Sequence, residues 1–217
     1  MKTTYRTSSS FFVSPVGRRL QEQVRLSLAD EKLKDVPAVL IGPVFPFLAA
    51  FDQNNPDFVE EKETLSGNDL LSPWLSTRNV NIVFIVALND SVTENLSVLI
   101  KEAARTLKQH GQLIILIKNK QKAGLLNIRE MPETPLSVFG SELKTGGFSV
   151  QRKKGILHFP YTLNIFKAAD DFLFKRFDGG GYFSLIIARK DPFVFSNAEN
   201  YSSTRMTNAS VLTSPRT

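Results

Sequence analysis

The stretch that decides the fold is a nearly unbroken apolar run, Val80-Asn81-Ile82-Val83-Phe84-Ile85-Val86-Ala87-Leu88. Its β-branched residues favour an extended backbone. Only Asn81 interrupts the apolar character, so side chains on both faces of the strand are expected to be buried. That pattern is typical of a central parallel strand covered by helices on both sides.

A helix and a second strand are predicted to follow. Ser91 and Glu94 have the spacing of a capping box, and apolar residues then recur at helical intervals. Gly111 is typical of a helix C-cap, which places His110 at the helix end. Residues 112–117 form another apolar run. A strand, a helix and a strand within about forty residues make a βαβ unit.

Upstream, Ser14 and Pro15 are a good N-cap and a good first helical residue. They predict an amphipathic helix that ends near Lys34. Its apolar residues recur every fourth position and so share one face: Leu20, Val24 and Leu28.

Residues 37–42 form a short apolar run closed by Gly42, which indicates a buried strand. Pro43 and Pro46 follow, so the next residues are expected to form a stiff loop. Residues 52–69 are acidic and show little sign of regular structure.

The last third predicts a strand over residues 148–159, with Lys153 and Lys154 exposed, and a final strand over 182–188. A helix over 162–177 and a turn at Asp178-Gly179-Gly180-Gly181 lie between them. Alternating strands and helices favour an α/β fold with a largely parallel sheet. The helix is expected to bury one face made of Leu163, Phe166, Ala169, Leu173 and Phe177.

The 217 residues are enough for one domain with tails. We expect the domain to span residues 13–191, between disordered segments at 1–12 and 192–217 that are rich in Ser, Thr and other polar residues. The absence of cysteine excludes disulfides and thiolate metal sites. His110 and His158 lie far apart without metal-ligand spacing, so no metal site is predicted.

The net charge of +6 is uneven, because residues 37–75 are acidic and the later half is basic. A basic face can attract nucleic acid. No aromatic residues alternate with Lys118, Lys120, Lys122 or residues 152–154, so these cations are interpreted as a solvated face. Nucleic acid is therefore not an expected partner.

No window approaches the roughly 20 apolar residues that a membrane span needs. Residues 1–10 contain Lys2 and Arg6 but no apolar core, unlike a secretory signal. The sequence therefore predicts a cytoplasmic protein. Because residues 1–10 are basic, acid-free and rich in Ser and Thr, a mitochondrial transit peptide is the alternative.

Three stretches together resemble class I S-adenosylmethionine (SAM) methyltransferases of the type 11 kind. The first runs from the strand at 80–88 to Leu113-Ile114-Ile115 and includes Arg105, Leu107 and Gly111, which match the family's "reeArRvLkpGGrLli". The second, residues 145–150, is similar to the family's "aGF.v" turn. The third, residues 182–190, is similar to its closing strand.

Two further motifs resemble a divergent bacterial branch of that family. Ser14-Pro15-Val16-Gly17-Arg18-Arg19-Leu20 is similar to "SP.GRrl", and Ile41-Gly42-Pro43-Val44-Phe45-Pro46-Phe47-Leu48 is similar to the variant cofactor loop "GiGyatPyL". The resemblance covers residues 13–191. It implies a Rossmann-like methyltransferase sheet, mostly parallel with an antiparallel last strand and helices on both faces.

The resemblance also implies SAM as cofactor. Residues that match the family's cofactor-binding positions are Gly42, Pro43, Val44, Phe45, Asn68, Asp69 and Leu88. Asn68 and Asp69 belong to a segment similar to the family's "D...LPF", where one or the other would contact adenine. The methyl acceptor implied is a small molecule or another, unidentified acceptor. Catalytic residues are not specified by the motifs.

The sequence also departs from the family pattern. Only Gly42 remains of the usual Gly-x-Gly-x-Gly loop, and Asn81 replaces the family's aspartate at the fourth strand. These departures support an alternative function, a catalytically inactive methyltransferase fold that serves as a scaffold or regulatory partner of another protein. His158 has two interpretations as well, a packed core histidine or a residue on the substrate side of the cleft.

Overall fold

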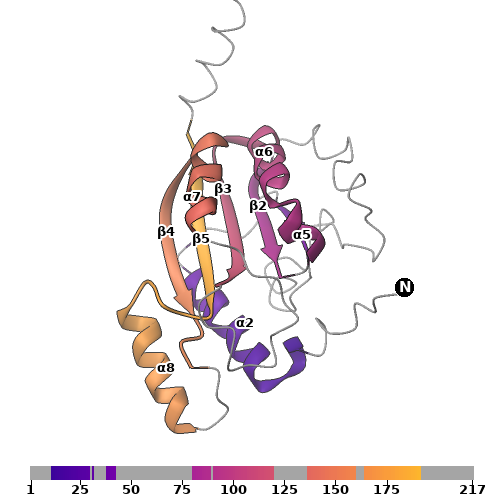
Figure 1. Ribbon diagram of the computed structural model, residues 1–217. Helices are drawn as coiled ribbons and strands as arrows, with labels where there is room; N and C mark the ends of the chain where they lie inside the picture. The colour runs from indigo at the N-terminus through magenta and orange to yellow at the C-terminus, as the bar shows by residue number, and fades with distance from the viewer. Residues whose placement is uncertain are drawn as a thin grey trace, which may run out of the picture.

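The computed structural model describes residues 11–29, 31, 38–42, 80–88, 90–119, 136–159 and 164–191. Its centre is a five-stranded sheet (Figure 1). The strands are β1 (Ala38–Ile41), β2 (Val80–Ala87), β3 (Leu107–Lys118), β4 (Phe148–Ile156) and β5 (Phe183–Lys190), in the spatial order β1-β2-β3-β5-β4.

The sheet is mostly parallel with an antiparallel last strand, as predicted. β1, β2 and β3 pair in parallel, whereas β5 is antiparallel to both β3 and β4. The apolar run that begins at Val80 forms the buried strand β2, between β1 and β3. Every residue of β2 except Asn81 is buried, which confirms the expectation of burial on both faces.

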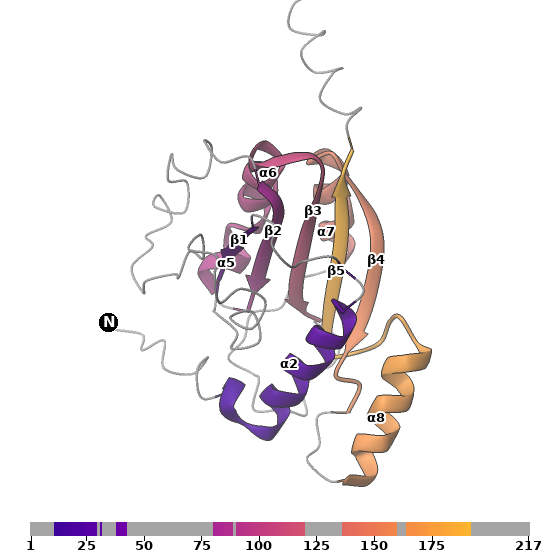
Figure 2. The ribbon, with the colours of Figure 1, turned by 180° about the vertical axis from the view of Figure 1, so that it is seen from behind.

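Helices cover both faces of the sheet (Figures 1 and 2). On one face, α2 (Pro15–Ser27) packs on the side chains of β2, β3 and β5, and Phe174 of α8 (Asn164–Arg176) joins the same cluster. On the other face lie α5 (Asp90–Glu94), α6 (Leu96–Thr106) and α7 (Leu136–Thr145). These two clusters are the two halves of the core.

The start of α2 is as predicted. The Ser14 side chain accepts a hydrogen bond from the Gly17 amide at 3.1 Å, and Pro15 is the first helical residue. The three apolar residues expected on its inner face are fully buried: Leu20, Val24 and Leu28. The helix ends at Ser27, however, so the expected end near Lys34 was wrong. Residues 11–13 form a helical turn, and the first two of them belong to the segment 1–12 that was expected to be disordered.

The predicted end of the helix before β3 was also wrong. α6 ends at Thr106, and Leu107 already pairs with Val80 in the sheet. The chain then departs from the ladder and returns at Gln112, opposite Ile82. Gly111 is therefore a strand residue that passes close to Asn81, where a Cβ would lie 3.0 Å from the Asn81 carbonyl oxygen. The left-handed residue is His110, with φ of 64°.

The inner face of α8 differs from the prediction. Asp170 and Phe174 are buried, whereas Phe177, assigned to the inner face, is 51% exposed. Asp170 replaces an apolar residue on this face because its carboxylate is held in a network of hydrogen bonds described below.

Within the described ranges, no helix is long and apolar enough to cross a membrane.

Candidate functional site

The carboxyl ends of β1, β2, β3 and β4 lie at one edge of the sheet, because these four strands point the same way. The residues that follow them are Gly42, Leu88, Asn119 and Leu157. Open α/β sheets bind their ligands in the crevice beyond this edge. α2 and α8 lie beside the same edge (Figures 1 and 2), so it is the candidate functional site.

Gly42 has a conformation that requires glycine. Its φ is 107°, which side chains rarely tolerate. A Cβ at this position would also lie 2.4 Å from the Val86 carbonyl oxygen. The chain therefore turns sharply at the end of β1 and passes directly against β2. A tight turn at this point is the first requirement of a dinucleotide-type cofactor loop.

Leu88 lies at the end of β2, on the same side of the sheet as Val86 and Phe84. It is 2% exposed, and its amide donates to the Val86 carbonyl at 3.0 Å. Gly42 and Leu88 are therefore brought together at the end of neighbouring strands. The other predicted cofactor-binding residues lie outside the described part of the chain: Pro43, Val44, Phe45, Asn68 and Asp69.

Asn119 fixes the end of β3 to the start of β5. Its amide donates to the Tyr182 carbonyl at 2.9 Å, and its side-chain Nδ2 donates to the Gly181 carbonyl at 2.7 Å. The Ser184 hydroxyl donates to Asn119 Oδ1 at 3.0 Å. Because all three contacts are buried or internal to the sheet, this part of the edge is rigid.

Lys118 corrects the interpretation of the basic residues as a solvated face. It is the last residue of β3 and is only 2% exposed. Ile114 and Leu116 belong to the cluster under α2, so the alternation of a strand places Lys118 on that side too. Its partner in the register is Phe183 of β5. One feature of the sequence indicates this burial: Lys118 directly follows the apolar run at residues 113–117.

The glycine turn 178–181 packs on the backbone of β4. A Cβ at Gly181 would lie 2.3 Å from the Ile156 carbonyl oxygen, and the Gly155 amide donates to the Asp178 carbonyl at 2.8 Å. Glycine is needed at position 181 for this close approach, so this part of the turn is structural.

Lys154 is 7% exposed, against the prediction that it is exposed. Its Nζ donates to Asp178 Oδ1 at 2.9 Å and lies 5.2 Å from the centroid of the Phe174 ring. The hydrogen bond from Lys154 and then its charge lower the pKa of Asp178, against a smaller effect of burial that raises it.

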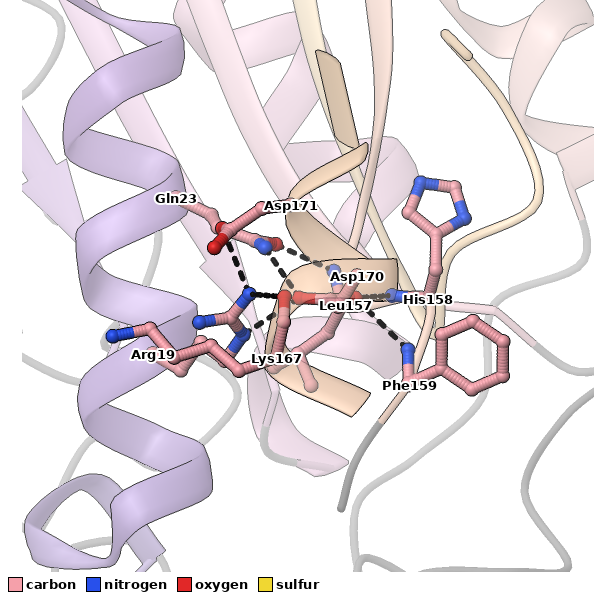
Figure 3. A network of polar contacts seen from close by, with 8 residues as sticks. All are labelled: Arg19, Gln23, Leu157, His158, Phe159, Lys167, Asp170 and Asp171. Carbon is pink, nitrogen blue, oxygen red and sulfur yellow. Dashed lines mark hydrogen bonds and ion pairs between the residues drawn. The ribbon is translucent and has the colours of Figure 1, made fainter. Parts of the chain in front are cut away.

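A fully buried carboxylate, Asp170 of α8, joins three separate elements (Figure 3). Its Oδ2 accepts from Arg19 Nε and Gln23 Nε2 of α2, both at 2.6 Å. Its Oδ1 accepts from the amides of His158 and Phe159, at 2.6 and 2.9 Å. Charge-assisted hydrogen bonds of this kind are the strong ones.

The same network extends beyond Asp170. Arg19 also donates to Asp171 Oδ1 at 2.8 Å and to the Lys167 carbonyl at 3.0 Å. Gln23 Oε1 accepts from the Leu157 amide at 2.8 Å. Sequence reasoning missed this cluster, although Arg19 and Gln23 are four residues apart and so share a helix face.

The turn before α2 explains the rest of the motif that begins at Ser14. A Cβ at Gly17 would lie 2.1 Å from the Phe11 carbonyl oxygen, so only glycine lets the turn fold back on the helix. The Phe11 ring then lies 5.3 Å from the Phe12 ring and 6.3 Å from the Phe183 ring. Phe11 thus connects the turn to the carboxyl edge of the sheet.

No protein-family model matches the sequence, and no curated protein matches it significantly. Solved structures do match. A SAM-dependent methyltransferase of Thermotoga maritima, described as a possible histamine N-methyltransferase, has a TM-score of 0.57 at 16% identity and covers 84% of this chain and 94% of its own. A SAM-dependent methyltransferase of Archaeoglobus fulgidus has a TM-score of 0.50 at 14% identity, with 85% and 100% covered.

The protein therefore has the fold of class I SAM-dependent methyltransferases. Strand order and strand directions agree with this conclusion. At these identities the likeness shows the fold alone, and folds host many functions.

Proposed function

We propose that the protein is a SAM-dependent methyltransferase that acts on a small molecule or another, unidentified acceptor. The observation that carries the proposal is Gly42, whose φ of 107° turns the chain at the end of β1, next to Leu88 at the end of β2. The methyltransferase fold supports it. We expect the protein to act in the cytoplasm.

In this proposal, backbone groups of Gly42 to Phe45 hold the cofactor, Asn68 or Asp69 contacts its adenine, and Leu88 provides an apolar wall. When bound, SAM supplies an activated methyl group. The protein contributes mainly position and alignment, which are worth several kcal/mol in such reactions. The rigid end of β3 at Asn119 and the Asp170 network supply a firm frame for that alignment.

The alternative is an inactive methyltransferase fold that binds a protein partner. One observation favours it: Gly42 is fully explained by its contact with Val86. A glycine at position 42 is therefore expected whether or not the protein binds a cofactor there.

The two functions differ in one experiment. SAM labelled in its methyl group is incubated with a cell extract and purified protein, and labelled products are separated by size and by extraction. The proposal predicts label in products with wild-type protein and loss of that label with Gly42→Asp. A folded wild-type protein that neither binds S-adenosylhomocysteine (SAH) nor transfers label supports the inactive scaffold.

A further inference from the structure

The two carboxylates and the three cations of α8 differ in their partners. Asp170 and Asp171 both pair with Arg19 of α2, at 2.6 and 2.8 Å. The cations are exposed, and within the described ranges none of them forms an ion pair: Lys167, Lys175 and Arg176. Because Arg19 offsets much of the negative charge, the solvent-facing surface of α8 has a net positive charge.

An exposed aromatic ring lies among these cations. Phe172 is 62% exposed, more than any other described phenylalanine. Residues three and four positions apart are neighbours on a helix surface, so Ala168 lies on one side of Phe172, and Lys175 and Arg176 lie on the other. All four residues are exposed, and together they form the outer face of α8.

The outer face is held firmly beside the carboxyl edge of the sheet. On its inner side α8 contributes Phe174 to the core, and Asp170 accepts hydrogen bonds from two amides of the turn after β4. Figures 1 and 2 both show α8 at the margin of the molecule, beyond the end of β4. A partner that binds the outer face is therefore brought close to the candidate site.

The chemistry of the outer face fits a partner with negative charge over an apolar layer. An anionic lipid bilayer has both, because its headgroups attract Lys and Arg while an aromatic ring enters the acyl boundary. Single-stranded nucleic acid fits less well, since its binding sites are grooves in which several aromatic rings stack on successive bases. The outer face of α8 has one ring, on a convex helix.

We propose that the outer face of α8 docks on an anionic membrane surface, with Phe172 entering the headgroup region and Lys175 and Arg176 contacting lipid phosphates. Docking of this kind is peripheral and reversible, because a single ring and a few cations hold the protein. It needs no cofactor, so it is tested independently of the proposed function.

The test is flotation of the full chain with lipid vesicles of two compositions, phosphatidylcholine alone and equal parts of phosphatidylcholine and phosphatidylglycerol. The expected result is binding to the vesicles that contain phosphatidylglycerol and none to the others. High salt should release the protein, because it screens exposed charges.

Variants of the outer face locate the binding surface. Phe172→Ala should lower the partition coefficient about tenfold or more, whereas Phe172→Trp should retain binding, because tryptophan favours the membrane interface. Lys175→Gln combined with Arg176→Gln should lower it roughly fivefold for each cation removed. Thermal unfolding checks that these variants, all at exposed positions, remain folded.

A control variant removes the same charge elsewhere. Lys101→Gln combined with Lys108→Gln changes exposed residues of α6 and of the start of β3, away from α8. This variant should bind like wild type. An equal loss in the control would show that net charge alone attracts the protein, and the proposal would be wrong.

Other results would also overturn the proposal. They are an absence of binding to phosphatidylglycerol vesicles at low salt, equal binding to both kinds of vesicle, and unchanged binding of Phe172→Ala. Binding of polyglutamate or of an RNA homopolymer through the same residues, without binding to vesicles, would assign the outer face to a different class of partner.

Discussion

Arg19 and Asp170 are 151 positions apart in the chain, yet the arginine Nε lies 2.6 Å from the aspartate Oδ2. The aspartate side chain is completely buried and that of the arginine is 11% exposed. The ion pair therefore joins α2 to α8 with little competition from water. Because Asp170 also accepts two backbone amides, the same contact determines the shape of the chain after β4.

Replacing Asp170 with alanine should be strongly destabilising. The change leaves Arg19 Nε, Gln23 Nε2 and two backbone amides without the acceptor they share. Removing one partner of a buried ion pair costs about 3–5 kcal/mol. Urea unfolding of the purified variant measures the loss. Asp171→Ala is the control: its side chain is 46% exposed, so we expect a loss of about 0–1 kcal/mol. Equal losses for the two variants would contradict the assignment of Asp170 as the centre of the network.

Gly42→Ala should destabilise the protein by about 1–3 kcal/mol, the usual cost of a non-glycine residue in a strained conformation. The added Cβ also meets the Val86 carbonyl oxygen. Gly140→Ala is the matched control, since Gly140 is in α7 and a Cβ there meets nothing within 4 Å. The free energy of unfolding of Gly140→Ala should rise by about 0.5–1 kcal/mol, because alanine is more stable than glycine inside a helix. Thermal unfolding of both variants measures the difference in stability. A Gly42→Ala variant as stable as wild type would contradict the prediction.

The glycine turn allows a second matched comparison. Gly181→Ala should destabilise by about 1–3 kcal/mol, since its Cβ would overlap the backbone of Ile156. A Cβ at Gly179 meets nothing within 4 Å, so Gly179→Ala should be neutral or gain about 0.4–1 kcal/mol. Denaturant unfolding measures the change in stability of both variants. Similar changes at the two positions would show that the turn does not pack on β4 as described.

The ion pair of Lys154 and Asp178 predicts that the stability of the fold falls slightly at acidic pH. The folded-state pKa of Asp178 is lowered, first by the hydrogen bond from Lys154. A carboxyl group with a lowered pKa stabilises the fold above its ordinary pKa of 3.8, and that contribution is lost as pH falls through the lowered value. Asp178→Asn should therefore be less stable than wild type at pH 6, and the difference should shrink as the pH falls below 3.8 and through the lowered pKa. Since the Asp178 side chain is 78% exposed, the effect is expected to be small. An undiminished difference at pH 2.5 would contradict it.

The elements of the fold could be predicted because each has a local signal. Buried strands such as β2 are apolar runs, and α2 begins with the cap at Ser14 and Pro15. The errors occur where distant residues override that signal. His110 takes the left-handed conformation expected of a cap glycine, because Leu107 has already joined the sheet.

The candidate site was predicted only in part, for a related reason. Gly42 and Leu88 follow apolar strands, so their place at the carboxyl edge is predictable from the order of elements. The buried states of Lys118, Lys154 and Asp170 are not, because charged residues are expected at the surface unless their partners are known. The described partners of Asp170 come from α2, 147 or more positions away, and from the turn after β4. Nothing in the local sequence indicates them.

The central claim, that the carboxyl edge beside Gly42 binds the cofactor, is tested most directly by thermal unfolding of the full chain with increasing SAH. A ligand at 100 times its dissociation constant stabilises by about 2.7 kcal/mol, which raises the Tm of a domain of this size by about 5–10 °C. The account predicts a rise of this order for wild type and for Gly140→Ala, and none for Gly42→Asp. An unchanged Tm of wild-type protein at millimolar SAH would contradict it and would favour the inactive scaffold.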